Sequence, residues 1–126
     1  MMNNRDNLIS IIVPCYNEEH AIPYFYKAIT EHSTLMKNEF GVDFEYLFIN
    51  DGSVDNTLTV LKEYANKDNR VKYISFSRNF GKESAMYAGL KNASGNYIAI
   101  MDADLQDPPY LLTEMYKTII ESDYDC

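Results

Sequence analysis

The sequence predicts an α/β fold, in which a Rossmann-like parallel sheet carries helices on both faces. Four short apolar runs alternate along the chain with four longer stretches of helical character. Strands that alternate with helices of about ten to twenty residues form right-handed βαβ units, and such units build a parallel sheet. A chain of 126 residues is long enough for one domain with a sizeable core. We predict the strand order 3-2-1-4 across this sheet.

The N-terminal third of the chain predicts one strand and one helix. Leu8 to Cys15 (LISIIVPC) is nearly continuous in apolar residues, which is typical of a strand buried on both faces. The following helix should begin between Glu18 and Pro23, because proline is tolerated in a first helical turn. It should end at about Phe40, since Gly41 is a typical helix stop.

The rest of the chain repeats this alternation, with glycine, proline and short polar residues at the boundaries. We expect a strand at 44–50, a helix capped by Asp55 or Asn56 and ending near 66, a strand at 71–77, a helix at 82–93 closed by Ser94 and Gly95, a strand at 97–101, and a helix from Pro108 to about 122.

The charge of the chain excludes some classes of partner. Eleven basic and nineteen acidic residues give a formal net charge of -8, which repels nucleic acid and anionic membrane surfaces. A phosphate ligand would need a divalent cation or backbone N–H groups to bind here. Neither Cys15, in an apolar strand, nor the terminal Cys126 predicts a disulfide. No run approaches the roughly 20 apolar residues of a membrane span, so we expect the chain itself to be soluble.

Acidic residues gather where ligands bind in parallel sheets, outside the carboxyl ends of the strands. The segments expected at this edge are 15–19, 50–55, 77–82 and 102–107. Helix capping explains part of their acidity, because a carboxylate before a helix stabilises it by roughly 0.5 to 2 kcal/mol. The acidic residues of these segments are Glu18, Glu19, Asp51, Asp55, Asp102, Asp104 and Asp107.

The segment Asp102-Ala103-Asp104 directly follows an apolar strand and predicts a metal site. Two carboxylates one residue apart on an extended segment can share one hard cation, which in turn holds a diphosphate. The small Ala103 leaves the backbone accessible. The alternative is a solvated loop, since this short pattern also occurs often by chance.

Three further positions have a functional and a structural interpretation. Asp51 could accept hydrogen bonds from a nucleoside base or a ribose hydroxyl, or cap the turn at Gly52. The ring of Tyr16 could stack on a base, or pack against the protein. Lys82, together with Arg78, could form an anion site at a helix start, or be a solvated cation.

Four motifs in combination, IIVPCYNEE, INDGSVDNT, SFSRNFGKESAMYAGL and GNYIAIMDADLQDPP, resemble the family 2 inverting glycosyltransferases with the GT-A fold. The order and spacing match from residue 8 onward. The resemblance is greatest to enzymes that load a sugar onto a polyprenyl phosphate, namely bactoprenol glucosyltransferases and dolichol-phosphate mannose synthases. It implies that residues 1–126 are the nucleotide-sugar-binding portion of a GT-A domain, truncated before the acceptor half and inactive alone.

The resemblance also assigns site residues, one position at a time. It implies a Mg²⁺ or Mn²⁺ ion on Asp102 and Asp104, with Asp104 as the catalytic residue. Lys82 falls where relatives carry a basic or a small residue, and we include it in the nucleotide-sugar site. The positions that match the nucleoside-binding residues are Pro14, Tyr16, Glu18, Ile49 and Asp51. Those that match the metal and diphosphate segment are Asp102, Ala103, Asp104 and Gln106.

The implied reaction is direct displacement at the anomeric carbon of a UDP-glucose-like or GDP-mannose-like donor, with inversion. The cation would stabilise the charge that develops on the leaving diphosphate. A polyprenyl phosphate acceptor is largely dianionic at neutral pH and needs no strong base, which agrees with His20 and His32 being expected at the surface. The full-length protein would act at the cytoplasmic face of the membrane. The predicted fourth strand lies at a sheet edge, which favours a homo-oligomer.

Other functions share parts of this pattern. A binding module could hold a nucleotide sugar without turnover. A phosphoacceptor receiver domain would need its acceptor aspartate after the third strand, where Ser77-Arg78-Asn79 stands instead. A dinucleotide-dependent oxidoreductase would need glycines in the first turn, which reads PCYNEE. The sequence specifies neither the sugar, the base, the acceptor nor the choice between Mg²⁺ and Mn²⁺.

Overall fold

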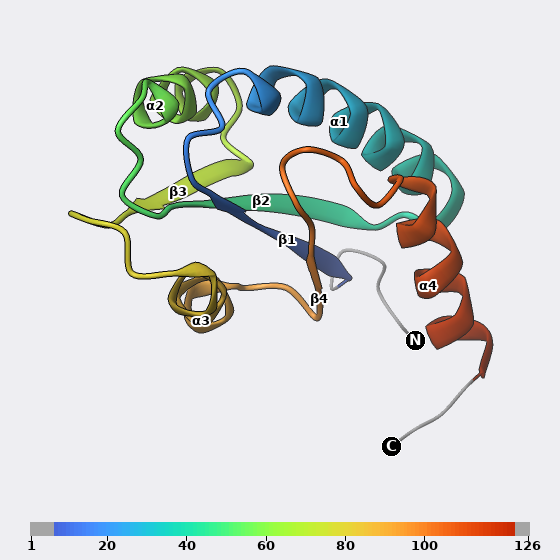
Figure 1. Cartoon of the computed structure of the whole chain (residues 1–126). Helices are drawn as coiled ribbons and strands as arrows, with labels where there is room; N and C mark the ends of the chain where they lie inside the picture. Colours follow the sequence, from blue (N-terminus) through green and yellow to red (C-terminus); the bar gives the residue numbers. More distant parts are fainter. Residues whose placement is uncertain (1–6, 123–126) are drawn as a thin grey trace.

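The computed structural model describes residues 7–122, in which four strands and four helices alternate (Figure 1). The elements are β1 (Leu8–Cys15), α1 (Ala21–Phe40), β2 (Asp43–Asn50), α2 (Thr57–Lys67), β3 (Val71–Ser75), α3 (Lys82–Asn92), β4 (Tyr97–Ile100) and α4 (Tyr110–Ser122). The alternation of strands and helices is the predicted one. Cys126 lies outside the described residues.

All strand pairs are parallel, and the order is β3-β2-β1-β4, which confirms the predicted topology. Two element boundaries differ from the prediction by two residues, and the others agree to within one residue. β3 ends at Ser75 because its partner β2 ends at Asn50, the residue paired with it. α4 begins at Tyr110 because Pro108 and Pro109 first form a tight turn. In this turn the Pro108 carbonyl accepts the Leu111 N–H, and the Pro109 carbonyl accepts the Leu112 N–H.

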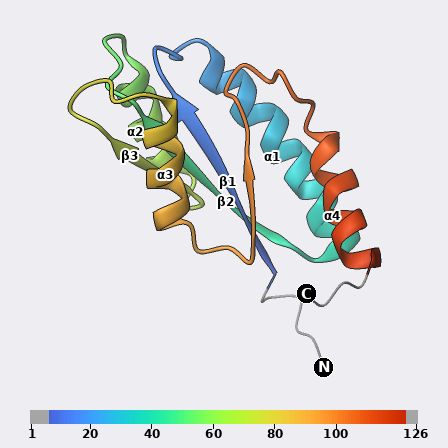
Figure 2. The same cartoon turned by 60° about the horizontal axis from the view of Figure 1, so that its bottom comes forward.

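Helices cover both faces of the sheet, but unequally (Figures 1 and 2). α1, α2 and α4 pack on one face, where a large core joins alternate residues of β1 to side chains such as Phe25, Leu61 and Leu112. α3 packs on the other face, where Ile12 and Ala85 belong to a smaller core. The sheet is therefore buried on both sides near its centre, as the apolar sequence of β1 predicts.

The first helix ends as its sequence predicts. Gly41 adopts the left-handed conformation with φ 74, and its N–H donates to the Lys37 carbonyl at 2.8 Å. At the other end of α1, the N–H groups of Ala21 and Ile22 donate to the Glu18 carbonyl. The β1–α1 loop is therefore short, and it holds Glu18 beside the carboxyl end of the sheet.

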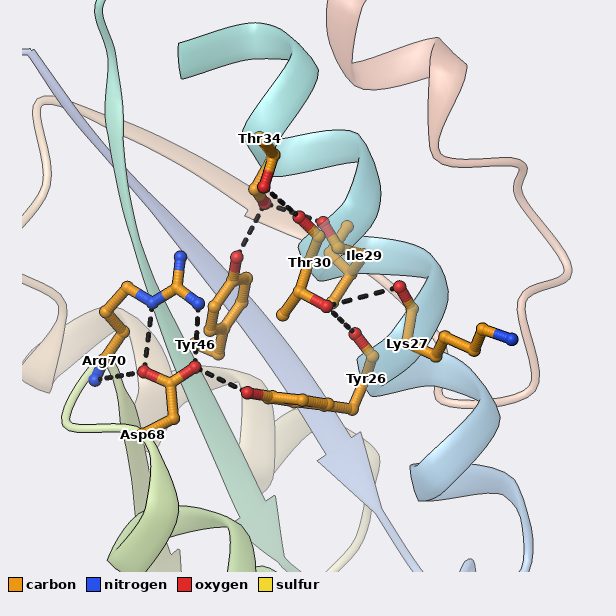
Figure 3. A network of polar contacts seen from close by, with 9 residues as sticks. Tyr26, Lys27, Ile29, Thr30, Thr34, Tyr46, Asp68 and Arg70 are labelled. Atoms are coloured by element: carbon orange, nitrogen blue, oxygen red, sulfur yellow. Dashed lines mark hydrogen bonds and ion pairs between the residues drawn. The ribbon is translucent and has the colours of Figure 1, made fainter. Parts of the chain in front are cut away.

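A polar network joins α1 to the α2–β3 connection and to β2 (Figure 3). The Asp68 carboxylate accepts two hydrogen bonds from the Arg70 guanidinium, at 3.0 and 2.8 Å, and one from the Tyr26 hydroxyl at 2.7 Å. The guanidinium also lies over the Tyr46 ring, 5.5 Å from its centroid, and the Tyr46 hydroxyl donates to Ser33. Arg70 lowers the pKa of Asp68 to about 2.

A buried carboxylate fixes the connection between α3 and β4. Glu45 accepts hydrogen bonds from the Ser10 hydroxyl and the Ser94 N–H, and it pairs with the Lys72 ammonium at 2.9 Å. The Gly95 N–H in turn donates to Ser10, and a Cβ at Gly95 would crowd β1. The predicted helix stop at Ser94 and Gly95 is thus tied directly to the central strands.

The two histidines differ in their surroundings. His20 is exposed, as expected. The expectation for His32 is wrong, because this residue is half-buried and its Nε2 lies 2.6 Å from the Thr113 hydroxyl of α4. This contact helps to hold α4 beside α1. Within residues 7–122, helices of the length and hydropathy needed to cross a bilayer are absent.

Candidate functional site

The carboxyl ends of β1, β2 and β4 meet the start of α3 around a pocket of about 170 Å³. The pocket brings together six of the ten predicted site residues, which confirms that the acidic segments converge at one end of the sheet. Its lining residues are Pro14, Cys15, Tyr16, Glu18, Asp51, Lys82 and Asp102.

Asp51 lies at the bottom of this pocket and is almost fully buried, with 4% of its surface exposed. One carboxylate oxygen accepts the Phe80 N–H at 2.8 Å, and the other accepts the Gly81 N–H at 3.1 Å. The Asn79 side chain adds a hydrogen bond at 3.2 Å. Asp51 therefore anchors the loop before α3. The turn-cap interpretation of Asp51 is wrong, because the Asn50 side chain accepts the N–H of that turn.

Gly52 allows this loop to approach the end of β2. Its φ is 69, and a Cβ here would overlap the carbonyl carbon of Arg78 and the backbone nitrogen of Asn79. Glycine is therefore required at this position on two independent grounds, its conformation and its lack of a side chain. The close approach brings the Asn79 amide to Asp51, a role that the sequence did not reveal.

Asp102 and Lys82 form an ion pair across the pocket. The Lys82 ammonium lies 2.9 Å from one Asp102 carboxylate oxygen, and the two side chains are 60% and 32% exposed. The hydrogen bond to Asp102, together with its negative charge, raises the pKa of Lys82. Lys82 is the first residue of α3 and Asp102 follows β4, so the pair joins two elements that flank β1.

A tight turn presents Asp104 to solvent. The Leu105 N–H donates to the Asp102 carbonyl at 3.1 Å, and Leu105 has a φ of 58. Leu105 packs against the core, and Ala103 is 2% exposed. These two apolar side chains point inward, while Asp104 is exposed and accepts a hydrogen bond from Gln106 at 3.1 Å.

Negative charge accumulates around Glu18. Partial burial raises the pKa of Glu18, and the nearby carboxylates of Asp104, Asp102 and Asp55 raise it further. These charges repel one another in the absence of a cation. The negative charge of the site is therefore suited to a divalent ion. In this structure the Lys82 ammonium is the cation that pairs with Asp102.

The side chains available as metal ligands also limit how a metal ion would be bound. Among residues 7–122, no group of three or more acidic, histidine or cysteine side chains is arranged to enclose a metal. Asp102 and Asp104 offer oxygen atoms only, which suits Mg²⁺ or Mn²⁺ better than softer metals. Mg²⁺ usually keeps several waters and binds one or two carboxylates plus substrate phosphates. These residues fit such an ion when a diphosphate completes its coordination.

A second, open hollow of about 620 Å³ shares Tyr16 with the pocket. It lies between the β2–α2 and β3–α3 loops, and its lining includes Asn50, Asp55 and Arg78. Tyr16 is 47% exposed, so its ring is available to a planar ligand. The two hollows are therefore adjacent, with Tyr16 in the lining of both.

The remaining predicted site residues lie away from the open pocket. Ile49 is fully buried in the smaller core, so it presents no surface to a ligand in this structure. Ala103 is likewise buried, whereas Asp104 and Gln106 are exposed beyond the pocket rim. Burial raises the pKa of the Cys15 thiol, which donates to the Val13 carbonyl and is therefore unsuited to nucleophilic chemistry.

A group of hydrogen bonds that sequence reasoning missed joins the β1–α1 loop to the β2–α2 loop. The Asn17 N–H donates to the Ser53 hydroxyl at 2.8 Å, and the Glu18 N–H donates to Thr57 at 2.9 Å. Of the two predicted capping residues, Asn56 is at the N-cap but makes no side-chain cap hydrogen bond, whereas the Asp55 carboxylate accepts the N–H of Thr57, the first residue of α2. Asn17 has a φ of 55 and accepts the Val54 N–H. In the sequence, the one signal for this contact is that both loops contain short polar side chains.

The sequence matches the model of the family described as glycosyl transferase family 2 over residues 10–126. It is 48% identical over 121 residues to the putative glycosyltransferase CsbB of Bacillus subtilis, an alignment that covers 96% of this chain and 35% of the relative. It is 49% identical over 100 residues to the bactoprenol glucosyl transferase of Shigella phage SfV, covering 79% of this chain and 31% of the relative. The chain thus spans about a third of the length of these relatives.

Solved structures show the same fold. A structure of TarS residues 1–349 from S. aureus in complex with UDP matches with a TM-score of 0.69 and 29% identity, over 90% of this chain and 32% of that one. The mannosyltransferase PcManGT from Pyrobaculum calidifontis, in complex with GDP-Man and Mn²⁺, matches with a TM-score of 0.70 and 22% identity, over 90% and 32%.

The parallel sheet of order 3-2-1-4 and the likeness to TarS define an α/β domain of the GT-A class. The chain belongs to glycosyltransferase family 2.

Proposed function

We propose that this chain binds a nucleoside diphosphate sugar together with Mg²⁺ or Mn²⁺, as the donor-binding portion of an enzyme that glycosylates a polyprenyl phosphate. The observation that carries the proposal is the convergence of Asp51, Lys82 and Asp102 in one pocket at the end of the sheet. The likeness to a bactoprenol glucosyl transferase supports a lipid acceptor. With such an acceptor, the full-length protein would act at the cytoplasmic face of the membrane. The TarS complexes with UDP and UDP-GlcNAc support the class of donor.

The two hollows suggest how the donor is arranged. The base would lie in the larger hollow, against the exposed ring of Tyr16, which also lines the smaller pocket that contains Asp51. The diphosphate would extend toward Lys82 and the Asp102–Asp104 turn in the smaller pocket. A chain with a net charge of -8 needs cations to hold a diphosphate. The smaller pocket contains the Lys82 ammonium, and Asp102 and Asp104 could hold a divalent ion beside it.

The chemistry implied for the complete enzyme is displacement of the nucleoside diphosphate by an acceptor oxygen. When bound, the divalent ion supplies Lewis-acid stabilisation of the negative charge on the leaving diphosphate. Asp102 and Asp104 would hold that ion, and Lys82 would add a second positive charge. A lipid phosphate attacks without a strong general base, since it is largely ionised at neutral pH.

Calorimetry with UDP-glucose and with GDP-mannose tests this proposal. We expect binding in the presence of Mn²⁺ and at least tenfold weaker binding without it. Asp104→Asn should weaken the Mn²⁺-dependent binding, whereas Asp43→Asn should not, because the Asp43 carboxylate pairs with Lys37 at the opposite end of the sheet. Equal affinity with and without the ion, or an unaffected Asp104→Asn variant, would count against a metal role.

A second candidate is donor binding without turnover. The observation that favours it for this chain is its coverage of only about a third of the relatives' length. Donor hydrolysis and transfer to a short polyprenyl phosphate, measured by release of the nucleoside diphosphate, separate the two candidates. The family match removes the receiver-domain alternative.

A further inference from the structure

We propose that Lys82 is a built-in counter-cation of the metal site, which neutralises Asp102 while no divalent ion is bound and moves to the donor diphosphate when the ion arrives. This inference rests on the proposed function, and it assigns Lys82 two successive partners. It also makes metal binding and Lys82 antagonistic in the absence of nucleotide, but cooperative in its presence.

The first partner is visible in the structure. The Lys82 ammonium donates to Asp102 at 2.9 Å, and it pairs with the same carboxylate that is proposed to hold the ion. Among the described residues that line the pocket, Lys82 is the one basic side chain, against three acidic ones. Its ammonium is therefore the local positive charge that offsets them.

The backbone before Lys82 is held in place, so exchange of partners involves the side chain. The Asp51 carboxylate accepts the N–H groups of Phe80 and Gly81, the two residues that precede Lys82. Lys82 is also the first residue of α3, whose N–H at Ala85 donates back to the Gly81 carbonyl. The flexible four-carbon side chain of Lys82 can therefore move within the pocket while the loop before α3 keeps its conformation.

The ion pair is weak enough to exchange. Both side chains are partly open to water, and pairs of this kind change an equilibrium constant by no more than about fivefold. An ammonium and a divalent ion on one carboxylate repel each other, so Lys82 must leave Asp102 as the ion binds. The diphosphate provides the released ammonium with a new anionic partner in the same pocket.

A simple electrostatic role predicts something different. If Lys82 only attracted anions, its loss would weaken nucleotide binding and leave metal binding unchanged. If it instead shares Asp102 with the ion, its loss removes a competitor and tightens metal binding.

The test measures Mn²⁺ binding by electron paramagnetic resonance of the free ion, first without nucleotide. We expect Lys82→Met to bind Mn²⁺ about two- to fivefold more tightly than the unmodified chain, and Lys82→Arg to bind it with nearly unchanged affinity. With Mn²⁺ saturating, Lys82→Met should bind UDP at least tenfold more weakly. Lys37→Met is the matched control, because it breaks the distant pair with Asp43 and should change neither affinity.

The outcomes separate this inference from the proposed function. Unchanged or weaker Mn²⁺ binding by Lys82→Met, with binding that Asp102→Asn abolishes, would overturn the role of Lys82 and leave the metal site standing. Mn²⁺ binding that Asp102→Asn does not reduce, or no binding with or without UDP, would overturn the proposed metal site and this inference together. Circular dichroism of each variant verifies that the fold is retained.

Discussion

The Asp51 carboxylate and the Gly81 N–H are 30 residues apart in the sequence and meet at 3.1 Å across the end of the sheet. Asp51 thus has a structural role without any ligand, since its oxygens already accept two backbone N–H groups and an amide. A nucleoside that binds here must share this carboxylate with the loop, or displace the Asn79 amide.

We predict that Asp51→Asn destabilises the protein even without ligand. The substitution places an NH₂ group where the carboxylate accepts backbone hydrogen bonds, and a buried unsatisfied donor costs about 1 to 3 kcal/mol. Urea unfolding measures the change. Asp107→Asn, at an exposed position, removes the same charge and should change the free energy of unfolding by less than about 0.5 kcal/mol. Equal stability of both variants would mean that the loop is held by other contacts.

A second prediction concerns Gly52. Gly52→Ala combines an unfavourable φ with overlap against the backbone of Arg78 and Asn79. Gly81→Ala is its matched control, because Gly81 also has a positive φ, of 105, but a Cβ there would meet nothing within 4 Å. We expect Gly52→Ala to lose about 1 to 3 kcal/mol more than Gly81→Ala in urea unfolding, since forced overlap carries a cost of this size. A smaller loss at Gly52 would show that the loop yields easily.

A third prediction is the dependence of stability on pH through Asp68. The folded protein lowers the pKa of this carboxyl from 3.8 to about 2, so the ionised form is favoured by folding. Its contribution is therefore fully present above the unfolded value and is lost as pH falls toward 2. At neutral pH we expect Asp68→Asn to cost about 1 to 3 kcal/mol, because the hydrogen bonds to a charged group are lost.

Chemical unfolding of Asp68→Asn and of the unmodified chain between pH 7 and pH 2 measures this effect. The difference between the two should be constant above about pH 5 and should shrink between about pH 4 and pH 2. Asp43→Asn serves as the control, because its pair with Lys37 is about half exposed and contributes at most about 1 kcal/mol. A difference that does not vary with pH would assign the stabilising effect to packing in the network instead.

A fourth prediction concerns self-association through β4. This strand lies at the sheet edge among the described strands, and Ile98 and Ile100 are 45% and 38% exposed beside an apolar groove of about 500 Å³. Unpaired edge strands favour pairing with another chain. We expect the chain to form dimers or larger species as its concentration rises, and Ile98→Lys to shift it toward the monomer.

Light scattering over a concentration series measures this association. Leu35→Lys is the matched control, because Leu35 is 63% exposed on α1, which packs on the opposite face of the sheet from Ile98. It should leave the association unchanged. A monomer at all concentrations would contradict the prediction, and equal effects of both lysine variants would assign the association to net charge.

The sequence predicted the features that depend on local pattern. The apolar run of β1, the stop at Gly41 and the start of α2 beside Asp55 and Asn56 are each encoded within a few residues, and the structure agrees with all three. The strand order also agreed, since the acidic segments could converge only if the strands that carry them were neighbours.

Features that depend on distant partners were not predictable in the same way. The last residue of β3 is set by where β2 ends, and the surroundings of His32 are set by α4, 81 residues later. Asp51 was expected to contact either a ligand or its own turn, but its donors come from the loop before α3. The ion pair of Lys82 with Asp102 likewise required the fold, because 20 residues separate the two.

The hydrogen bonds between the β1–α1 and β2–α2 loops have a consequence for the order in which a ligand is recognised. They hold the walls around Tyr16 in a fixed arrangement before any ligand arrives, whereas Asp104 and the pair of Lys82 with Asp102 are open to water. A rigid wall loses little entropy on binding, and an open rim must still be ordered. If the proposed function is correct, the nucleoside end of a donor would therefore meet a preassembled receptor, while the phosphate end would complete its coordination after docking.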